Sequence, residues 1–481
     1  MATAKTVRFV SLTVTGSDSG VGGVVLVTVD SLRADAVGEN TPTLDALGRD
    51  GTDFRQAYAH GNWTPFSFPS VLGSDEVFAD GDRVGPSTAP TLAERLQAAG
   101  VRTAGFNAAN GFLTRHWGYD RGFDEFDPMT GGARTPVGRF LDAHPTVRGW
   151  MEFVGWPLRA VADRLRGRTD GVAVDTAKRG AVERRARSFL RDVGDDRFFC
   201  WVHLMDTHTP YVPAPRHLRE VGAGRSETFS LLRGHLRAGL GRGVDDETLA
   251  ALRTAYEAAA RGVDETLERL LETLSATGRR ADTLVVVAGD HGEEFLEHGH
   301  LAHYPKVYDE LAHVPLVVDH PEGDGRTVET PVGLSDVPAT VCDALGLSTA
   351  GLAGDSLTPV AVDGAAPNAD PVTTLAVRGE RVTEQPIPRR LADGDPVVAA
   401  RTDRWTYVRN TAAGEEELYD RETDPTEQDD RAADPPADAP VERLRRAASG
   451  RLDRLERGDS EPTRDDGDDD LQRRLEALGY A

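Results

Sequence analysis

Three short apolar runs constrain the fold of this chain more than any other feature. They are Val24–Val29, Phe198–Val202 and Thr283–Ala288, and each is rich in β-branched or aromatic residues. Runs of this length without polar alternation are typical of strands buried on both faces. Helical patterns lie between them, such as Asp264–Leu274, where apolar residues recur every three or four positions. This alternation predicts an α/β fold with a mostly parallel sheet that is covered by helices on both sides.

The chain of 481 residues is long enough for one large core and a smaller appended unit. We expect a large α/β domain over residues 20–370, with helical or loop insertions at about 130–195 and 214–250, where the periodicity is weaker. Short alternating runs then predict a small antiparallel β subdomain over residues 371–420.

The C-terminal part has a different composition. Residues 421–470 are dominated by Asp, Pro, Arg and Glu, which predicts an acidic linker that is solvated or disordered. A short terminal helix is expected within residues 471–481.

The chain is acidic, with 55 Lys and Arg against 79 Asp and Glu, and its only lysines are Lys5, Lys178 and Lys306. A net charge of −24 opposes binding to nucleic acid or to an anionic membrane, so we expect neither partner. No apolar stretch approaches the roughly 18 residues of a membrane span, and the first twenty residues lack the apolar core of a signal peptide. We therefore expect a cytoplasmic protein. The excess of acidic residues and the scarcity of lysine are typical of a protein kept soluble in concentrated salt, where screening shortens the range of its self-repulsion, so we also expect it to be halophilic. An ordinary acidic protein from a GC-rich genome is the alternative.

Each of the three apolar runs stops at residues that can bind a cation. The loops at the carboxyl ends of parallel strands form the ligand crevice of such a sheet, so these residues can converge there. A lone Asp after a strand is more often a turn former or a helix cap, but two ligand types between Gly289 and Gly292 are harder to explain by packing. Carboxylates with an imidazole would suit Mn, Zn or Ca. The residues are Asp30 after the first run, His203, Asp206 and His208 around the second, and Asp290 and His291 after the third.

Thr64 precedes Pro65 at the start of a helical pattern. One interpretation is structural: Thr64 is the N-cap and Pro65 the first helical residue. The other is functional: a hydroxyl at a helix N-terminus lies where an anionic ester is attracted, and a bound metal could make it a nucleophile. The local sequence alone favours the cap.

Six segments occur in a characteristic order along the chain: VLVTVDSLRAD, NWTPFSFPSVLGS, TLAERLQAAGVRTAGF, HLMDTHTPY, VVVAGDHGEEFLEHG and KVYDELAHVPLVV. In this order they resemble the sulfatase family of the alkaline-phosphatase superfamily. The match continues through VGLSDVPATVCDALGL and LYDRETDPTEQ to the terminal LEALGYA, so it spans nearly the whole chain.

The resemblance implies roles for individual residues. Asp30 matches the first metal carboxylate, Asp290 and His291 match the later metal pair, and His208 matches the histidine that contacts the ester anion. Thr64 stands where the family has its nucleophile.

The nucleophile segment departs from the family pattern. Typical sulfatases have a Cys or Ser that is oxidised to formylglycine within C/S-x-P-x-R, whereas Thr64–Phe68 has neither the oxidisable residue nor the Arg. Threonine nucleophiles occur in similar proteins such as nucleotide pyrophosphatases and lipoteichoic acid synthase, which act on phosphate diesters. The resemblance therefore favours phosphoryl chemistry without excluding sulfate.

Two further departures remove charge from the expected site. Ser31 replaces a second metal carboxylate, and Asn107 and Asn110 lie where the family has Lys-x-His. We therefore expect one divalent ion (Ca, Mn, Zn or Mg) and a substrate that is not multiply charged. Either Lys306 or His303 could supply a cation for the anion. The expected catalytic residues are Thr64, His208 and Lys306, the substrate-binding residues His203, His303 and Asn110, and the metal ligands Asp30, Thr64, Asp290 and His291.

The expected function is metal-dependent hydrolysis of a sulfate or phosphate ester, including diesters and phosphonates, of a small molecule or glycan. A transferase that passes the group to an alcohol is an alternative. A catalytically silent metal- or anion-binding homologue is a third, motivated by the missing Cys and Arg.

Overall fold

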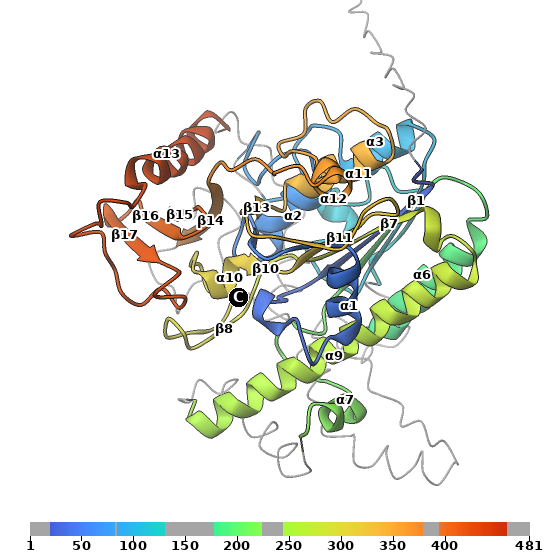
Figure 1. Cartoon of the computed structure of the whole chain (residues 1–481), viewed down its shortest axis with the longest axis horizontal. Coiled ribbons are helices and arrows are strands. Elements are labelled where there is room, and N and C mark those ends of the chain that lie inside the picture. The colour runs from blue at the N-terminus through green and yellow to red at the C-terminus, as the bar shows by residue number, and fades with distance from the viewer. Residues whose placement is uncertain (1–19, 82–83, 130–177, 224–243, 379–393, 459–481) are drawn as a thin grey trace, which may run out of the picture.

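The computed structural model describes residues 20–81, 84–129, 178–223, 244–378 and 394–458. Its centre is an eight-stranded sheet in the order β12-β2-β11-β7-β1-β6-β4-β5 (Figure 1). The three apolar runs form the middle strands β1 (Gly23–Val29), β6 (Phe198–Leu204) and β7 (Thr283–Gly289), in which every residue is buried. Strand β1 pairs in parallel with both β6 and β7. The prediction of a mostly parallel, doubly covered sheet is confirmed.

The outer strands keep this direction with one exception. Strand β11 (Leu316–Asp319) is antiparallel to both of its neighbours, β7 and β2 (Thr52–Phe54). The others are β4 (Arg102–Asn107), β5 (Glu125–Asp127) and β12 (Arg326–Val328).

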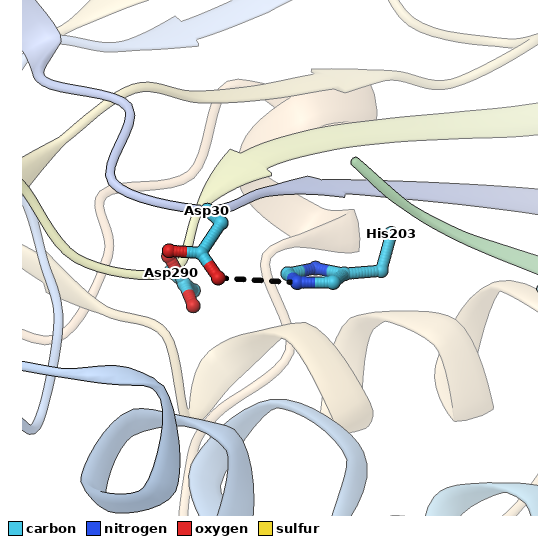
Figure 2. Close-up of side chains that lie close together, drawn as sticks. All are labelled: Asp30, His203 and Asp290. Atoms are coloured by element: carbon cyan, nitrogen blue, oxygen red, sulfur yellow. Dashed lines mark ion pairs between the residues drawn. The ribbon is translucent and has the colours of Figure 1, made fainter. Parts of the chain in front are cut away.

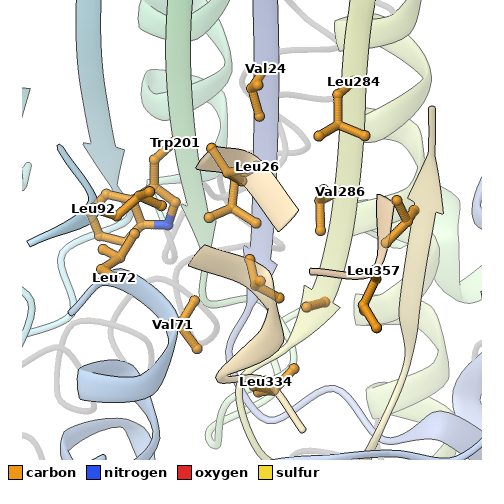
Figure 3. Close-up of a cluster of buried hydrophobic side chains, with 14 of the residues drawn as sticks. Val24, Leu26, Val71, Leu72, Leu92, Trp201, Leu284, Val286, Leu334 and Leu357 are labelled. Carbon is orange, nitrogen blue, oxygen red and sulfur yellow. The ribbon is translucent and has the colours of Figure 1, made fainter. Parts of the chain in front are cut away.

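Helices cover both faces of the sheet (Figure 1). Alternate side chains of β1 point to opposite faces, so Val24 and Leu26 belong to one core and Val25 and Val27 to the other. Figure 3 shows the first core, where Leu26 lies with Val71 of helix α2. On that side lie α2 (Thr64–Leu72), α3 (Leu92–Ala98), α11 (Asp336–Ala344) and α12 (Thr358–Asp363); on the other lie α1 (Pro42–Asp50), α6 (Arg179–Asp192) and α9 (Asp246–Ala276).

Helix α6 corrects the expectation that 130–195 is an insertion throughout. Its Val182, Ala186 and Phe189 are buried against the sheet. This apolar stripe was masked by the many arginines between its members. The second expected insertion, 214–250, contains α7 (Pro215–Glu220) and the first turn of α9 in its described part. Residues 130–177 and 224–243 lie outside the described residues.

A second sheet follows, as expected for the C-terminal part. It is antiparallel and lies beside the main sheet (Figure 1). It consists of β14 (Val372–Arg378), β15 (Asp395–Arg401), β16 (Trp405–Asn410) and β17 (Glu415–Asp420).

The expected disordered linker over 421–470 is wrong over residues 441–458. These residues form helix α13 (Val441–Gly458), which packs on the second sheet. Leu444, Ala448 and Leu455 recur at helical spacing and are buried in one cluster with Trp405 and Tyr407. The high charge of the segment belongs to the exposed face of an amphipathic helix. The helix expected within 471–481 lies outside the described residues.

The remaining elements are short. Three of them, β3, β10 and β13, form a small sheet, and β8 and β9 form a hairpin after β7. Within the described ranges, no helix has the length and apolar character needed to cross a bilayer. The bounds are β3 (Ala57–Tyr58), β8 (Glu294–Phe295), β9 (Leu301–Ala302), α10 (Asp309–Ala312), β10 (His313–Val314) and β13 (Val332–Gly333).

Candidate active site

Three central strands bring acidic and imidazole side chains together at the carboxyl edge of the sheet. Asp30 follows β1, Asp290 follows β7, and His203 is part of β6. All three are fully buried, and one ligand atom from each lies within 4.8 Å of the others (Figure 2). The arrangement is a candidate metal-binding group. His203 was expected to bind substrate, but it lies inside this group, with Nε2 at 3.5 Å from Oδ2 of Asp30.

Thr64 is the first residue of α2 and directs its hydroxyl toward the same group. Its Oγ1 lies 3.0 Å from Oδ2 of Asp290 and 3.3 Å from Oδ2 of Asp30. The helix begins one residue earlier than the capping interpretation predicts, because Trp63 is the N-cap residue. The Thr64 hydroxyl contacts carboxylates instead of closing the end of the helix.

His291 presents a lone pair to the two acidic groups. Its Nδ1 lies 2.8 Å from the Gly292 carbonyl oxygen, which can only accept, so Nδ1 carries the proton. Nε2 lies 3.4 Å from Oγ1 of Thr64 and 3.5 Å from Oδ1 of Asp30. Burial and the charge of His303 lower the pKa of His291 to about 4, so the ring is neutral near pH 7. Two acceptors that face each other in a buried site leave room for a cation between them.

The two carboxylates have opposite pKa shifts. Burial raises the pKa of the Asp30 carboxyl, but His208, His203 and His291 lower this pKa by a larger amount, so the net shift is downward. Burial and the charge of Asp30 raise the pKa of Asp290 well above its usual value. Two buried carboxylates this close cannot both ionise cheaply without a compensating positive charge. Their oxygens and the neutral imidazole of His291 therefore fit a divalent ion.

Ser31 and Asn110 fix the orientation of the carboxylates. The Ser31 N–H donates to Oδ1 of Asp290 at 3.0 Å, and its hydroxyl donates to Oδ1 of Asp30 at 3.1 Å. Ser31 has φ = 59°, a left-handed conformation that is strained for a residue with a Cβ. The Asn110 amide donates to Oδ2 of Asp30 at 2.8 Å and lies 3.3 Å from Oγ1 of Thr64. Asn110, expected to bind substrate, thus holds a metal-site carboxylate.

Two further histidines lie beside the Thr64 group. The ring centroid of His303 is 4.9 Å from that of His291 and 5.0 Å from that of His208. The His208 Nδ1 donates to the Thr209 carbonyl at 2.6 Å, which orients the ring. The contact of His208 and His303 with an anion stays a prediction.

Glu293 and Tyr211 support His303 and were not predicted. Oε2 of Glu293 lies 3.0 Å from Nδ1 of His303, and Tyr211 donates to the other oxygen of Glu293. Burial raises the pKa of Glu293, but the hydrogen bond from His303 brings it below its usual value. In the sequence, only the position of Glu293 two residues after His291 could have pointed to it.

Lys306 is paired with a buried carboxylate, and its expected role toward an anion stays a prediction. Its ammonium group donates to both oxygens of Glu294, at 2.9 and 2.8 Å, and to the His298 carbonyl at 2.6 Å. An ammonium group has three N–H donors, so these contacts use all of them. Of the two candidates for the anion-binding cation, the geometry favours His303. Asp206 also lies apart from the metal group and pairs with Arg179 at 3.4 Å.

Residues 23–347 match the sulfatase family model, so the chain belongs to the sulfatase family. The resemblance seen in the sequence is thereby confirmed. The chain is 32% identical to a choline-sulfatase of Rhizobium meliloti over 195 residues, which are 40% of this chain and 35% of that protein. It is 24% identical to an ulvan-active sulfatase of Formosa agariphila over 84% of this chain and 76% of that protein.

A solved structure is similar over a larger share of the fold. The phosphonate monoester hydrolase of Silicibacter pomeroyi superposes with a TM-score of 0.67 at 22% identity, covering 91% of this chain and 96% of that one. At this identity the likeness establishes the fold. The chain spans only about a third of the length of the choline-sulfatase.

Proposed function

We propose that this protein is a metal-dependent hydrolase of singly charged sulfate or phosphate esters, with Thr64 as its nucleophile and a preference for phosphoryl groups. The observation that carries the proposal is the position of the Thr64 hydroxyl, within 3.4 Å of Asp30, Asp290 and His291. An alanine or valine side chain could pack in the same place. A buried hydroxyl in contact with two carboxylates and an imidazole therefore indicates a chemical role and not a packing role.

Asp30, Asp290, His291 and Thr64 would hold a divalent ion. When bound, such an ion stabilises the negative charge that develops on the ester oxygens and favours the ionised form of the hydroxyl. The sulfatase family is metal-dependent in general, and a carboxylate and histidine group is present here.

The chain's own residues account for the proton transfers. Oγ of Thr64 attacks phosphorus or sulfur, a new O–P or O–S bond forms, and the bond to the alcohol oxygen breaks. The hydroxyl proton passes to Oδ2 of Asp290, 3.0 Å away. The departing alcohol oxygen takes a proton from His303 or His208. Water then attacks the ester of Thr64 and returns a proton to the histidine, while Asp290 reprotonates Thr64.

The site charge favours a singly charged ester. Lys306 is neutralised by Glu294. Asn110 has an amide where the family pattern has a charged side chain. Sulfate monoesters, phosphodiesters and phosphonate monoesters each carry one negative charge, whereas a phosphate monoester carries nearly two at pH 7. The names of the choline-sulfatase and of the phosphonate monoester hydrolase both point to ester groups that carry one negative charge.

A panel of p-nitrophenyl compounds tests the proposal. The metal-loaded protein is given the sulfate, the phosphate monoester, the bis(p-nitrophenyl) phosphate diester and the phenylphosphonate ester. We expect the diester and the phosphonate to have kcat/KM values at least about tenfold above that of the phosphate monoester, a difference of about 1.4 kcal/mol. A faster phosphate monoester would refute the charge argument, and a faster sulfate would refute the phosphoryl preference. No turnover by a metal-loaded protein would favour the silent binding homologue.

A further inference from the structure

We propose that His203 is an additional metal ligand, so that the ion is held by two imidazoles and two carboxylates and is a borderline transition ion such as Zn²⁺ rather than Ca²⁺ or Mg²⁺. The inference rests on the proposed function only in requiring a metal at Asp30 and Asp290. It concerns which ion binds and which side chains hold it.

The first observation is a buried imidazole nitrogen without a hydrogen bond. His203 is completely buried, and its Nε2 has no hydrogen-bond partner among the described residues. The ring packs edge-on against Phe68, with centroids 5.0 Å apart, so apolar surface encloses it on that side. Nε2 is directed at Oδ2 of Asp30, 3.5 Å away (Figure 2). This ion pair is longer than a normal N–H···O hydrogen bond, so the buried nitrogen is left without a close polar contact.

The second observation is the spacing of the donors. Ligand atoms of His203, Asp30 and Asp290 all lie within 4.8 Å of one another. Ligands that share one ion, each with a bond of about 2.0–2.2 Å, must lie within about twice that bond length. His291 lies outside this group of three, although its Nε2 is 3.5 Å from Oδ1 of Asp30 and 3.8 Å from Oδ1 of Asp290. All four side chains would share one ion after a rotation of the imidazole rings toward the carboxylates.

The third observation is a hydrogen-bond chain behind the ring. Nδ1 of His203 lies 2.9 Å from Oγ1 of Thr28, its partner in register on the neighbouring strand. The same oxygen accepts a hydrogen bond from the Trp201 indole at 2.9 Å, and its proton is directed at the Val202 carbonyl at 3.5 Å. Thr28 can therefore accept the Nδ1 proton of His203, which leaves the Nε2 lone pair toward the carboxylates. Metal-bound histidines commonly have the other nitrogen held in this way.

The donor set then selects the ion. Ca²⁺ takes six to eight oxygen ligands, and Mg²⁺ prefers oxygens and water. Two imidazoles and two carboxylates suit Zn²⁺ and its neighbours instead. Ser31 strengthens the preference, because it contributes hydrogen bonds to Asp30 and Asp290 where a third carboxylate would have added an oxygen ligand.

The experiment measures the metal directly, apart from activity. The metal-free protein is dialysed against equimolar Ca²⁺, Mg²⁺, Mn²⁺ and Zn²⁺, its metal content is measured by mass spectrometry, and X-ray absorption of the Zn²⁺ form counts its imidazole ligands. We expect Zn²⁺ in excess over Ca²⁺ and two imidazoles. H203Q should leave one imidazole and weaken Zn²⁺ binding by about 100-fold, and T28V should keep two imidazoles with binding weakened about tenfold. The control variant is H60Q. His60 is a buried histidine that hydrogen-bonds to Thr373 and Ser335, so this variant should change neither the imidazole count nor the Zn²⁺ affinity.

One imidazole in the wild type, or an unchanged Zn²⁺ affinity in H203Q, would overturn the inference and make His203 a hydrogen-bond donor to Asp30. Preferential binding of Ca²⁺, or no metal at all, would overturn it as well. The wild-type imidazole count keeps the test decisive if H203Q does not fold. A protein with two imidazoles on Zn²⁺ that cleaves no ester would leave this inference standing and refute the proposed function. An enzyme that is active with Ca²⁺ bound would refute this inference and leave the proposed function standing.

Discussion

Thr64 can be tested with two variants that divide its side chain. Thr64→Val keeps the branched shape in this buried position and removes the oxygen, while Thr64→Ser keeps the oxygen and removes the methyl group. As a nucleophile, the oxygen is essential, so we expect Thr64→Val to lose at least about 10³-fold in kcat, or about 4 kcal/mol of transition-state stabilisation. We expect Thr64→Ser to retain a measurable fraction of the activity.

The stability of the same variants separates the nucleophile from a helix cap. Oγ1 of Thr64 lies 3.0 Å from an Asp290 oxygen, and a hydrogen bond to a charged group contributes about 1.5–3 kcal/mol. A residue that served only as a cap would cost roughly 1 kcal/mol on replacement and leave turnover unchanged. The assays are initial rates on the phosphodiester, thermal melts and metal content. A folded, metal-loaded Thr64→Val protein with kcat within tenfold of the wild type would refute the role of Thr64.

Three further predictions concern the surroundings of the site and the whole chain. The partly buried carboxylate of Glu76 pairs with Arg451 at 2.6 Å, and although burial raises its pKa, Arg451 lowers it to about 2. The pair therefore contributes to the free energy of unfolding above the unfolded pKa of 4.5, and this contribution is lost as pH falls toward 2. In denaturant titrations, Glu76→Gln should lower the free energy of unfolding by about 3 kcal/mol at pH 7 and by much less at pH 2. A loss that does not depend on pH would contradict this. For poor leaving groups, His303→Ala should lower kcat by about 10²-fold, while the neutral pair Lys306→Met with Glu294→Gln should change it less than tenfold; equal losses would restore a role for Lys306. With a net charge of −24, the melting midpoint should rise between low and molar KCl, and a flat or falling midpoint would reject the halophilic assignment.

The parts of the site that sequence could predict are those set by strand ends. Asp30, Asp290 and His291 each follow an apolar run, and parallel strands place their carboxyl ends at one edge of the sheet. The position of Thr64 could be predicted for a similar reason, because Thr followed by Pro indicates the start of a helix. The central strands of the fold followed from the same short runs.

Lys306 shows why side-chain pairing could not be predicted. Its partner Glu294 is twelve residues away, and the two meet because the chain reverses through the β8–β9 hairpin. The sequence presents Lys306 as an unpaired cation near the metal motif. Helix α13 could not be predicted for a different reason. The apolar positions of the helix are present in the sequence, but the composition of residues 421–470, dominated by Asp, Pro, Arg and Glu, indicated a linker instead.

His203 depends on strand register, which belongs to a pair of strands and not to either one alone. Side chains alternate along β6, so His203 lies on the same face as Trp201 and opposite to Val202. That parity could be read once β6 was recognised. Whether the ring then reaches Asp30 depends on the alignment of β6 with β1, where His203 faces Thr28 and therefore lies two residues before Asp30. A shift of one residue would turn the ring away from both its hydrogen-bond partner and the carboxylates. The candidate metal site is thus predictable where it depends on strand ends and becomes visible only in the structure where it depends on strand register.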